Sequence, residues 1–237
     1  MASGGGRTSR AYRSNRREEQ ARATRRRVLE AAASSFRARG YAATTIRAVA
    51  AEAGVAVPTV ELLFGVKARL LKAAIDVAIA GDDAEVPVLQ RSWTEAAAAA
   101  GGAEELLTIV AGVIGPAQSR SAGLVLAVFE GSARDPELAD LSEQMIRQRA
   151  VTAGWLVDAL AEKATLREDL SRQEAVDAVW ILMDPALFDR LVRHRHWSVH
   201  RYQTWFALSA RRLLVPDAPD TDAPDTDTPS TDARRTT

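Results

Sequence analysis

Residues 44–64 (TTIRAVAAEAGVAVPTVELLF) constrain the fold of this chain more than any other stretch. Their first half carries apolar residues at the i, i+3, i+4 and i+7 positions of one helix face, namely Ile46, Val49, Ala50 and Ala53. Thr44 and Thr45 precede this helix, where an N-cap hydroxyl is favoured. Gly54 follows it, where a left-handed turn ends a helix at little steric cost. The sequence therefore predicts a short helix closed by a tight turn.

The second half of this stretch predicts another short helix. Pro58 suits its first turn, because the N–H that proline lacks would have no partner there. Val60, Leu63 and Phe64 give this helix an apolar side. Two short helices joined by a tight glycine turn form a helix-turn-helix, whose second helix lies in the major groove of DNA. The sequence therefore predicts a DNA-binding motif.

The run from Arg25 to Ala74 resembles the N-terminal three-helix domain of the TetR family of transcriptional regulators. The matching residues are Phe36, Gly40-Tyr41, Thr44 to Arg47, Ala50 to Val55, Thr59, Phe64, Lys67 and Leu70-Leu71. Residues 180–205 are similar to the last helices of actinobacterial-type members of the family. The resemblance implies an all-α fold, with a helix-turn-helix domain followed by a helical ligand-binding and dimerisation domain.

Three residues depart from the family pattern on the surface that faces DNA. Ala56 stands where members usually carry Ser, so the second helix lacks a side-chain N-cap worth about 1 kcal/mol. Glu61 replaces the usual Tyr, and Leu63 replaces the usual His or Tyr. An acid beside a phosphodiester backbone repels it. We expect the fold to survive these changes and the affinity for an operator to be reduced.

The candidate DNA-binding residues are Thr44, Thr45, Arg47, Val57, Pro58, Thr59, Glu61, Leu63 and Lys67. Arg47 and Thr59 lie early in the two motif helices, where they can reach a phosphate or a base edge. Val57 and Pro58 either meet thymine methyl groups or serve only to start the second helix. The resemblance places Lys67 like a phosphate-contacting lysine of the family.

The formal net charge of zero conceals a division along the chain. Residues 1–72 hold fifteen Arg and Lys against five Glu, a balance of +10, and the remaining residues balance this with −10. A neutral isoelectric point is therefore compatible with nucleic-acid binding, because the local field around the helix-turn-helix is positive.

Composition divides the chain into four parts. Residues 1–20 lack periodicity and predict a disordered basic arm, which either enters a minor groove or only increases solubility. Residues 21–80 form the DNA-binding domain, and residues 81–215 form the helical effector-binding and dimerisation domain. Residues 216–237 repeat Pro, Asp and Thr and predict a disordered tail. Asp135-Pro136, Ser171 to Glu174 and Ser198 mark expected helix starts.

Several functional classes are disfavoured. The chain has no cysteine, which suits a reducing cytoplasm, and no apolar run approaches the ~20 residues that span a bilayer. The N-terminus lacks the apolar segment of a secretory signal. His194, His196 and His200 have no nearby carboxylate to complete a metal site. We expect no metal, no cofactor and no enzymatic activity, since no catalytic constellation occurs.

The second domain offers two sets of aromatic and aliphatic candidates. Four aromatic residues on apolar helix faces either belong to the core or line an effector cavity: Trp93, Phe129, Trp155 and Trp180. Five residues on the C-terminal helices are expected at a homodimer interface: Trp180, Leu187, Leu191, Trp205 and Leu208. No convergent charge in this domain identifies the effector.

The sequence therefore predicts a homodimeric cytoplasmic transcriptional regulator. The family resemblance implies a repressor that binds operator DNA and is released by a small-molecule effector. The alternative is a ligand- or protein-binding module of the same fold with weakened or lost operator recognition, which Ala56, Glu61 and Leu63 favour.

Overall fold

Helices make up the regular structure throughout the described part of the chain, which confirms the predicted all-α fold. This computed structural model describes residues 6–84 and 86–216, and of residues 6–15 it gives the backbone alone. The elements are α1 (Gly6–Ala43), α2 (Ile46–Ala53), α3 (Val57–Phe64), α4 (Lys67–Ala80), the 3₁₀ turn η1 (Val88–Gln90), α5 (Ser92–Ala98), α6 (Ala103–Gly131), α7 (Pro136–Ala161), α8 (Arg172–Leu182), α9 (Pro185–Phe188), the π-helical η2 (Asp189–His194) and α10 (Val199–Leu214).

Three helices of the second domain begin where the sequence predicts them. Asp135 accepts hydrogen bonds from the first backbone amides of α7, and Ser171 forms a complete capping box with Glu174 at α8. Ser198 likewise caps α10 by accepting from the Arg201 amide. Gly40 adopts a φ of 70°, so its left-handed backbone ends the straight part of α1. Local capping chemistry therefore sets most of the element boundaries.

The N-terminal end of α1 differs from the prediction. The sequence predicts a disordered arm over residues 1–20, whereas α1 runs back to Gly6. Between Gly6 and Arg27 the chain is mostly Arg, Ala, Glu and Gln, which have high helix propensity, and it contains no proline. We call residues 6–27 the α1 extension. Residues 1–5, and the tail except for Pro216, lie outside the described residues.

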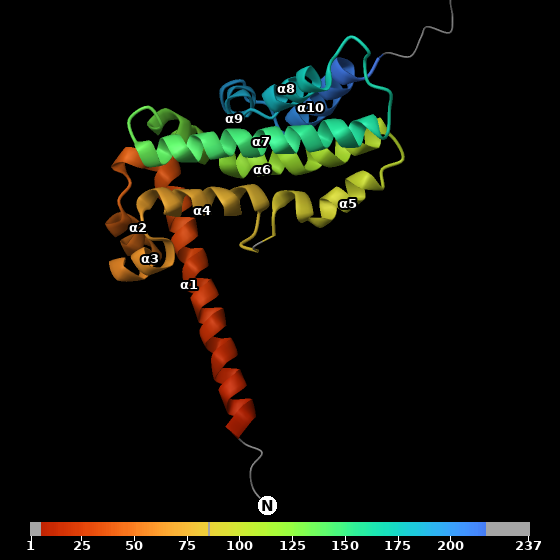
Figure 1. Cartoon of the computed structure of the whole chain (residues 1–237). Coiled ribbons are helices and arrows are strands. Elements are labelled where there is room, and N and C mark those ends of the chain that lie inside the picture. Colours follow the sequence, from red (N-terminus) through yellow and green to blue (C-terminus); the bar gives the residue numbers. More distant parts are fainter. Residues whose placement is uncertain (1–5, 85, 217–237) are drawn as a thin grey trace, which may run out of the picture.

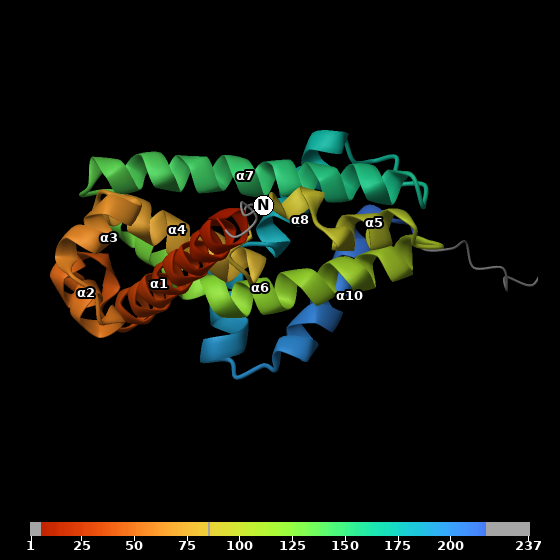
Figure 2. The ribbon, with the colours of Figure 1, turned by 90° about the horizontal axis from the view of Figure 1, so that it is seen from below.

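The long helices α6 and α7 lie side by side through the middle of the molecule (Figure 1). Helices α8 and α10 cover one side of this pair, and α4 and α5 lie on the other. The α1 extension projects away from the body, beyond α2 and α3 (Figure 1; Figure 2 from below). The helix-turn-helix thus sits at one end of the long pair.

Two hydrophobic cores hold this arrangement together, and α6 contributes to both. Leu106, Leu107 and Val110 in its first half pack into the core of the C-terminal helices. Leu124 and Val128 near its end pack into the core of α1 to α4. The length and hydropathy of α6 would allow it to cross a membrane, but its apolar side chains serve these two cores. The backbone turns at Gly81, yet the packing is continuous across that point.

Candidate nucleic-acid interface

The turn between α2 and α3 has the geometry that the sequence predicts. The Thr45 hydroxyl accepts a hydrogen bond from the Ala48 amide at 3.1 Å, which fixes the start of α2. Gly54 closes α2 with φ 65° and ψ 41°, a left-handed conformation that L side chains rarely adopt. Val60 and Phe64 then anchor α3 by burying one of its sides in the core of α1 to α4. The opposite side of α3 is left free.

The predicted DNA-binding residues differ in their access to solvent. Thr45, Arg47, Pro58 and Glu61 are exposed, whereas Val57, Thr59, Leu63 and Lys67 are half-buried. Leu63 packs against the core of α1 to α4, so its side chain serves the domain more than its outer surface. Exposed residues of α2 and α3 therefore share one end of the molecule.

Thr44 does not belong to this surface, and its prediction as a DNA-binding residue is wrong. Its side chain is fully buried. The hydroxyl lies 2.8 Å from the Gly40 carbonyl oxygen and 3.1 Å from that of Ser35, as donor to these acceptors. It therefore satisfies carbonyl groups where α1 ends at the Gly40 kink. The two adjacent threonines have separate structural tasks, which their sequence alone does not distinguish.

Lys67 is held by Tyr41 rather than extended into solvent. Its ammonium group donates to the Tyr41 carbonyl oxygen at 3.0 Å and lies 4.0 Å from the centre of the Tyr41 ring. Burial, with a smaller effect of Asp135 and Glu137, raises the pKa of the Tyr41 phenol to about 12. Lys67 thus ties α4 to the end of α1, and only its remaining donor capacity is available for a phosphate.

Leu62 is the residue of this surface that sequence reasoning missed. Its side chain is 88% exposed, the largest exposed fraction among the exposed large hydrophobic residues of the described chain. It lies on α3 directly after Glu61, facing away from Val60 and Phe64. Three of the last four residues of α3 are hydrophobic, and the sequence predicts one apolar side for this helix. The pattern therefore did not show that Leu62 lies on the other side. An exposed Leu at this position can contact a thymine methyl group.

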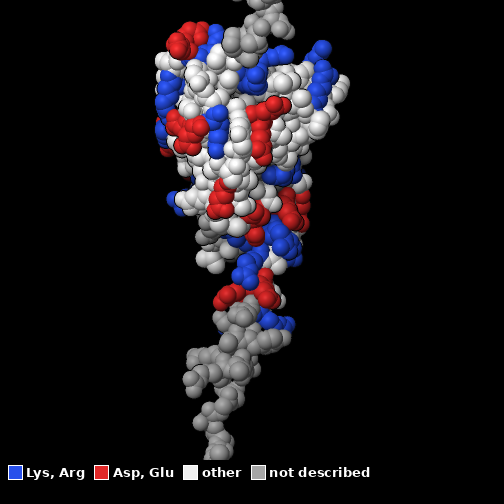
Figure 3. All heavy atoms as spheres, turned by 90° about the vertical axis from the view of Figure 1, so that its right-hand side faces the viewer, with Lys and Arg blue, Asp and Glu red and all other residues white. Residues whose placement is uncertain are grey.

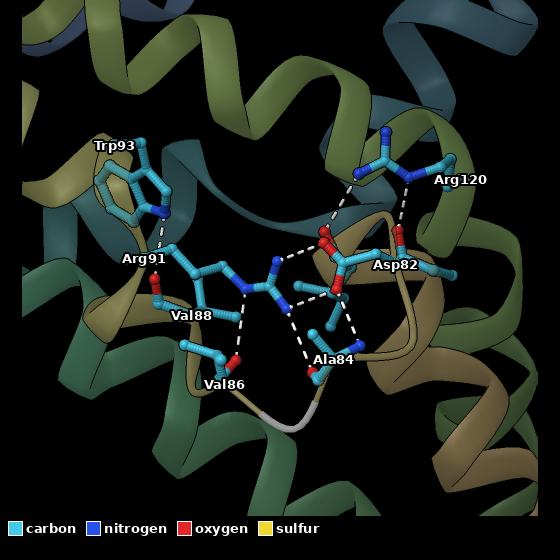
Figure 4. Close-up of polar contacts among 9 residues, drawn as sticks. Asp82, Ala84, Val86, Val88, Arg91, Trp93 and Arg120 are labelled. Atoms are coloured by element: carbon cyan, nitrogen blue, oxygen red, sulfur yellow. Dashed lines mark hydrogen bonds and ion pairs between the residues drawn. The ribbon is translucent and has the colours of Figure 1, made fainter. Parts of the chain in front are cut away.

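The junction between α4 and α5 is closed by a paired salt bridge (Figure 4). The Arg91 guanidinium donates to the two Asp82 carboxylate oxygens at 2.7 and 3.0 Å and also to the carbonyl oxygens of Ala84 and Val86. The hydrogen bonds from Arg91, followed by that from the Ala84 amide, lower the pKa of Asp82 to about 2. This network folds the connecting segment back onto itself.

Arg120 of α6 links the same junction to the DNA-binding domain (Figure 4). Its Nε donates to the Ala78 carbonyl oxygen at 2.7 Å, and one terminal nitrogen donates to that of Ile79 at 3.2 Å. Arg37 of α1 in turn donates to the Arg120 carbonyl oxygen at 3.3 Å. The last carbonyls of α4 are therefore satisfied by α6. These hydrogen bonds join α6 directly to the end of α4.

The four aromatic candidates for an effector cavity do not lie around one cavity. Trp93 and Trp155 form an edge-to-face pair with centroids 5.0 Å apart, and the Trp93 indole donates to the Val88 carbonyl. Phe129 packs instead against the core of α1 to α4. Trp180 lies over the Arg149 guanidinium, 3.9 Å from the ring centroid. Helical periodicity predicted that these residues face inward but could not distinguish the two cores.

The predicted interface residues occupy α8 to α10. Trp180, Leu187, Leu191 and Trp205 are half-buried, and Leu208 is 47% exposed. The Trp205 ring meets the Trp197 ring edge-to-face, with centroids 6.2 Å apart, and its centroid lies 6.0 Å from that of the tilted Tyr202 ring. Ile181 of α8 and Leu213 of α10 add exposed apolar surface. These helices therefore carry apolar side chains on their outer surface.

The three histidines are grouped where η2 meets α10. His194 lies 3.3 Å from Asp189, which also pairs with Arg193. Within residues 6–84 and 86–216, no group of three or more His, Cys, Asp or Glu side chains is arranged to hold a metal ion. Asp189 is thus a carboxylate close to His194 that the sequence did not reveal, and it also pairs with Arg193 of the same helix.

Residues 28–74 match the sequence model of bacterial regulatory proteins of the tetR family. The N-terminal domain belongs to the TetR family. The match spans the core of α1, the helix-turn-helix and the first half of α4. A comparison with curated proteins found no match.

About four fifths of the chain shares the fold of solved transcriptional regulators. One is the transcriptional regulator FadR from Bacillus subtilis in complex with stearoyl-CoA, 16% identical with a TM-score of 0.61 over 79% of this chain and 97% of that one. A second, from Saccharomonospora viridis, was crystallised with choline and is 20% identical, with a TM-score of 0.59 over 81% and 98% of the two chains. A third, assigned to the TetR family, comes from Rhodococcus sp. and is 15% identical, with a TM-score of 0.60 over 79% and 96%.

Proposed function

We propose that this protein is a transcriptional repressor of the TetR type that binds operator DNA through α3. The observation that carries this proposal is the free side of α3, where Pro58, Glu61 and Leu62 are exposed next to the capped α2. A helix held in this way by a helix-turn-helix can enter the major groove and reach base edges. Arg47 at the start of α2 is exposed beside it and is suited to a phosphate.

The repressor acts as a homodimer in this proposal. Ile181, Leu208 and Leu213 leave apolar surface on α8 and α10, between 45% and 53% exposed, and a second copy would cover it. A two-fold dimer would present one α3 to each half-site of a palindromic operator. Equilibrium sedimentation showing a monomer at micromolar concentration would contradict this part of the proposal.

A small molecule is proposed to release the DNA. Related structures were solved with choline and with stearoyl-CoA, which supports a ligand site in the helical domain. Arg120 supports a mechanical route, because it joins α6 of that domain to the end of α4. A ligand acts in this way only if it binds the DNA-free arrangement more tightly than the DNA-bound one. Choline and stearoyl-CoA are the first probes for such release.

The alternative is a binding module of the same fold with weakened operator recognition. It is favoured by the uncapped start of α3 at Ala56 and by the exposed acid Glu61. Selection of bound duplexes from a random pool separates the two functions. The repressor is expected to enrich an inverted repeat with half-sites about one helical turn or more apart. A pool that shows no enriched sequence would contradict the repressor and leave the alternative.

A further inference from the structure

The helix-turn-helix of this protein carries too little positive charge to hold DNA by itself. From Ile46 to Phe64 it contains one basic residue, Arg47, and two acids, Glu52 and Glu61, a balance of −1. Helix α3 contains no Lys or Arg at all. Neutralisation of phosphates supplies most of the non-specific affinity of proteins for DNA. The attraction must therefore come from another part of the chain.

The α1 extension is the most basic element beside this motif. Residues 6–27 hold nine Arg and two Glu, a balance of +7. In the part with described side chains, Arg16, Arg17, Arg22 and Arg27 are exposed. Figure 3 shows Lys and Arg gathered where α1 leaves the body, with acids next to them. A charge of this size can attract a polyanion on its own.

The helical form of the extension orders these charges. Eleven residues make about three turns of an α-helix, so two residues with this spacing lie in one row along it. Arg16 and Arg27 form one such pair, and Arg17 and the buried Val28 form another. Arg16, Gln20, Arg27 and Arg17 all lie within about 100° of one another around the helix axis. Glu18 and Glu19 lie outside this part of the helix surface, so it contains no acid. One side of the extension is therefore positive along its described length.

The extension is also fixed in place relative to α3. The Arg25 guanidinium lies 4.9 Å from the centre of the Phe64 ring, at the last residue of α3. From there the helix leaves the body at the end that carries α2 and α3 (Figures 1 and 2). Its 22 residues, from Gly6 to Arg27, span roughly 33 Å at 1.5 Å each. DNA bound to α3 would lie within reach of it.

We propose that the α1 extension is the principal phosphate-binding element of this protein. In this arrangement the extension provides attraction for any duplex, and α3 provides base contacts with little attraction. The proposal rests on the proposed function in assuming that α3 faces DNA. In proteins with a basic recognition helix, the helix-turn-helix itself binds the phosphates. Here this task is assigned to the extension.

The test compares two variants that lose the same charge. Arg16→Gln/Arg17→Gln/Arg27→Gln removes three exposed arginines of the extension, and Arg147→Gln/Arg190→Gln/Arg195→Gln removes three exposed arginines from α7, from η2 and from the turn after η2. Gln has nearly the helix propensity of Arg, and thermal melting checks that both variants fold. Fluorescence anisotropy on a duplex of scrambled sequence gives the affinity of each full-length variant between about 50 and 200 mM salt.

The extension variant is expected to bind at least about tenfold more weakly than the native protein, with a slope of log K against log salt that is flatter by about 2 to 3. The control variant should stay within about twofold of the native protein, since distant charges are screened at these salt concentrations. Equal slopes and affinities for the two variants would overturn the proposal.

The outcome also separates this proposal from the proposed function. If random selection enriches no sequence but the extension variant still loses affinity for scrambled DNA, the repressor is contradicted and the extension is confirmed. If an operator is enriched but the two variants behave alike, the repressor stands and the extension is excluded. If the native protein binds neither duplex, both proposals are overturned.

Discussion

The α1 extension and α3, the proposed recognition helix, are neighbours with opposite chemistry. Between residues 16 and 27 the extension is basic and most of its side chains are exposed, whereas α3 has a single charged residue, Glu61, and is anchored through Val60 and Phe64. In many DNA-binding proteins the attraction for the backbone and the contacts with base edges come from the same surface. Here the two tasks are assigned to different helices, so affinity and selectivity should respond to different substitutions.

The largest effect is expected where α3 depends on the core. Phe64→Ala removes a buried ring that holds the end of α3 and contacts Arg25, at a cost of about 3–5 kcal/mol in the free energy of unfolding. Operator preference should be lost while salt-dependent binding to scrambled DNA persists through the extension. Chemical denaturation and gel-shift titration measure the two quantities. Retained operator preference would show that α3 is not the reading element.

The next effect concerns the acid on α3. If Glu61 faces a phosphate, Glu61→Tyr removes a repulsion and adds a donor, and binding should tighten by about 1–2 kcal/mol, roughly tenfold, on operator and scrambled DNA alike. Glu130→Gln removes an exposed acid from α6 and serves as the control. If Glu61 instead accepts from a cytosine amino group, the substitution weakens binding to the operator alone. Gel shifts on both duplexes decide between these outcomes.

A substitution at Lys67 tests whether this residue of α4 contributes to the attraction for DNA or to the stability of the fold. Lys67→Gln loses the ammonium contacts with the Tyr41 carbonyl and ring, which should lower the free energy of unfolding by about 1 kcal/mol. Lys72→Gln is the control on the same helix, because it breaks only an ion pair with Asp76 at the surface. An unchanged stability with a flatter salt slope would identify Lys67 as a phosphate ligand instead.

The smallest effect is expected at Leu62. Leu62→Ala shortens an exposed side chain, so the free energy of unfolding should not change measurably. Preference for thymine at one operator position should fall a few-fold, which corresponds to less than about 1 kcal/mol of lost apolar contact. Val151→Ala on α7 is the control, because it shortens an apolar side chain that is 64% exposed and lies away from α3. Identical base preferences for the two variants would exclude Leu62 from readout.

Local signals in the sequence predicted much of this structure. Thr45, Gly54, Asp135 and Ser171 set helix boundaries through contacts with their immediate neighbours, and those boundaries are confirmed. The same signals identified the helix-turn-helix and its family. Interactions within a few residues depend on little besides the local sequence.

Properties that depend on distant parts of the chain were not predicted. Thr44 and Thr45 have the same hydroxyl, and only the packing of α1 buries one of them. Phe129 and Trp155 both lie on apolar helix faces but join different cores. Leu62 is exposed because α3 packs through the side that carries Val60 and Phe64. A single turn of apolar residues does not show from the sequence which side of a helix will pack. The sequence therefore predicted which helices form the candidate site, but not which of their side chains are exposed.

One measurement tests the division between the two helices most directly. The affinity of Leu62→Ala and of Arg16→Gln/Arg17→Gln/Arg27→Gln is measured on operator and on scrambled DNA over a range of salt concentrations. Leu62→Ala should lower the ratio of the two affinities and leave the salt slope unchanged. The arginine variant should flatten the slope and leave the ratio unchanged. If either variant alters the ratio and the slope together, attraction and readout are not separated between the α1 extension and α3.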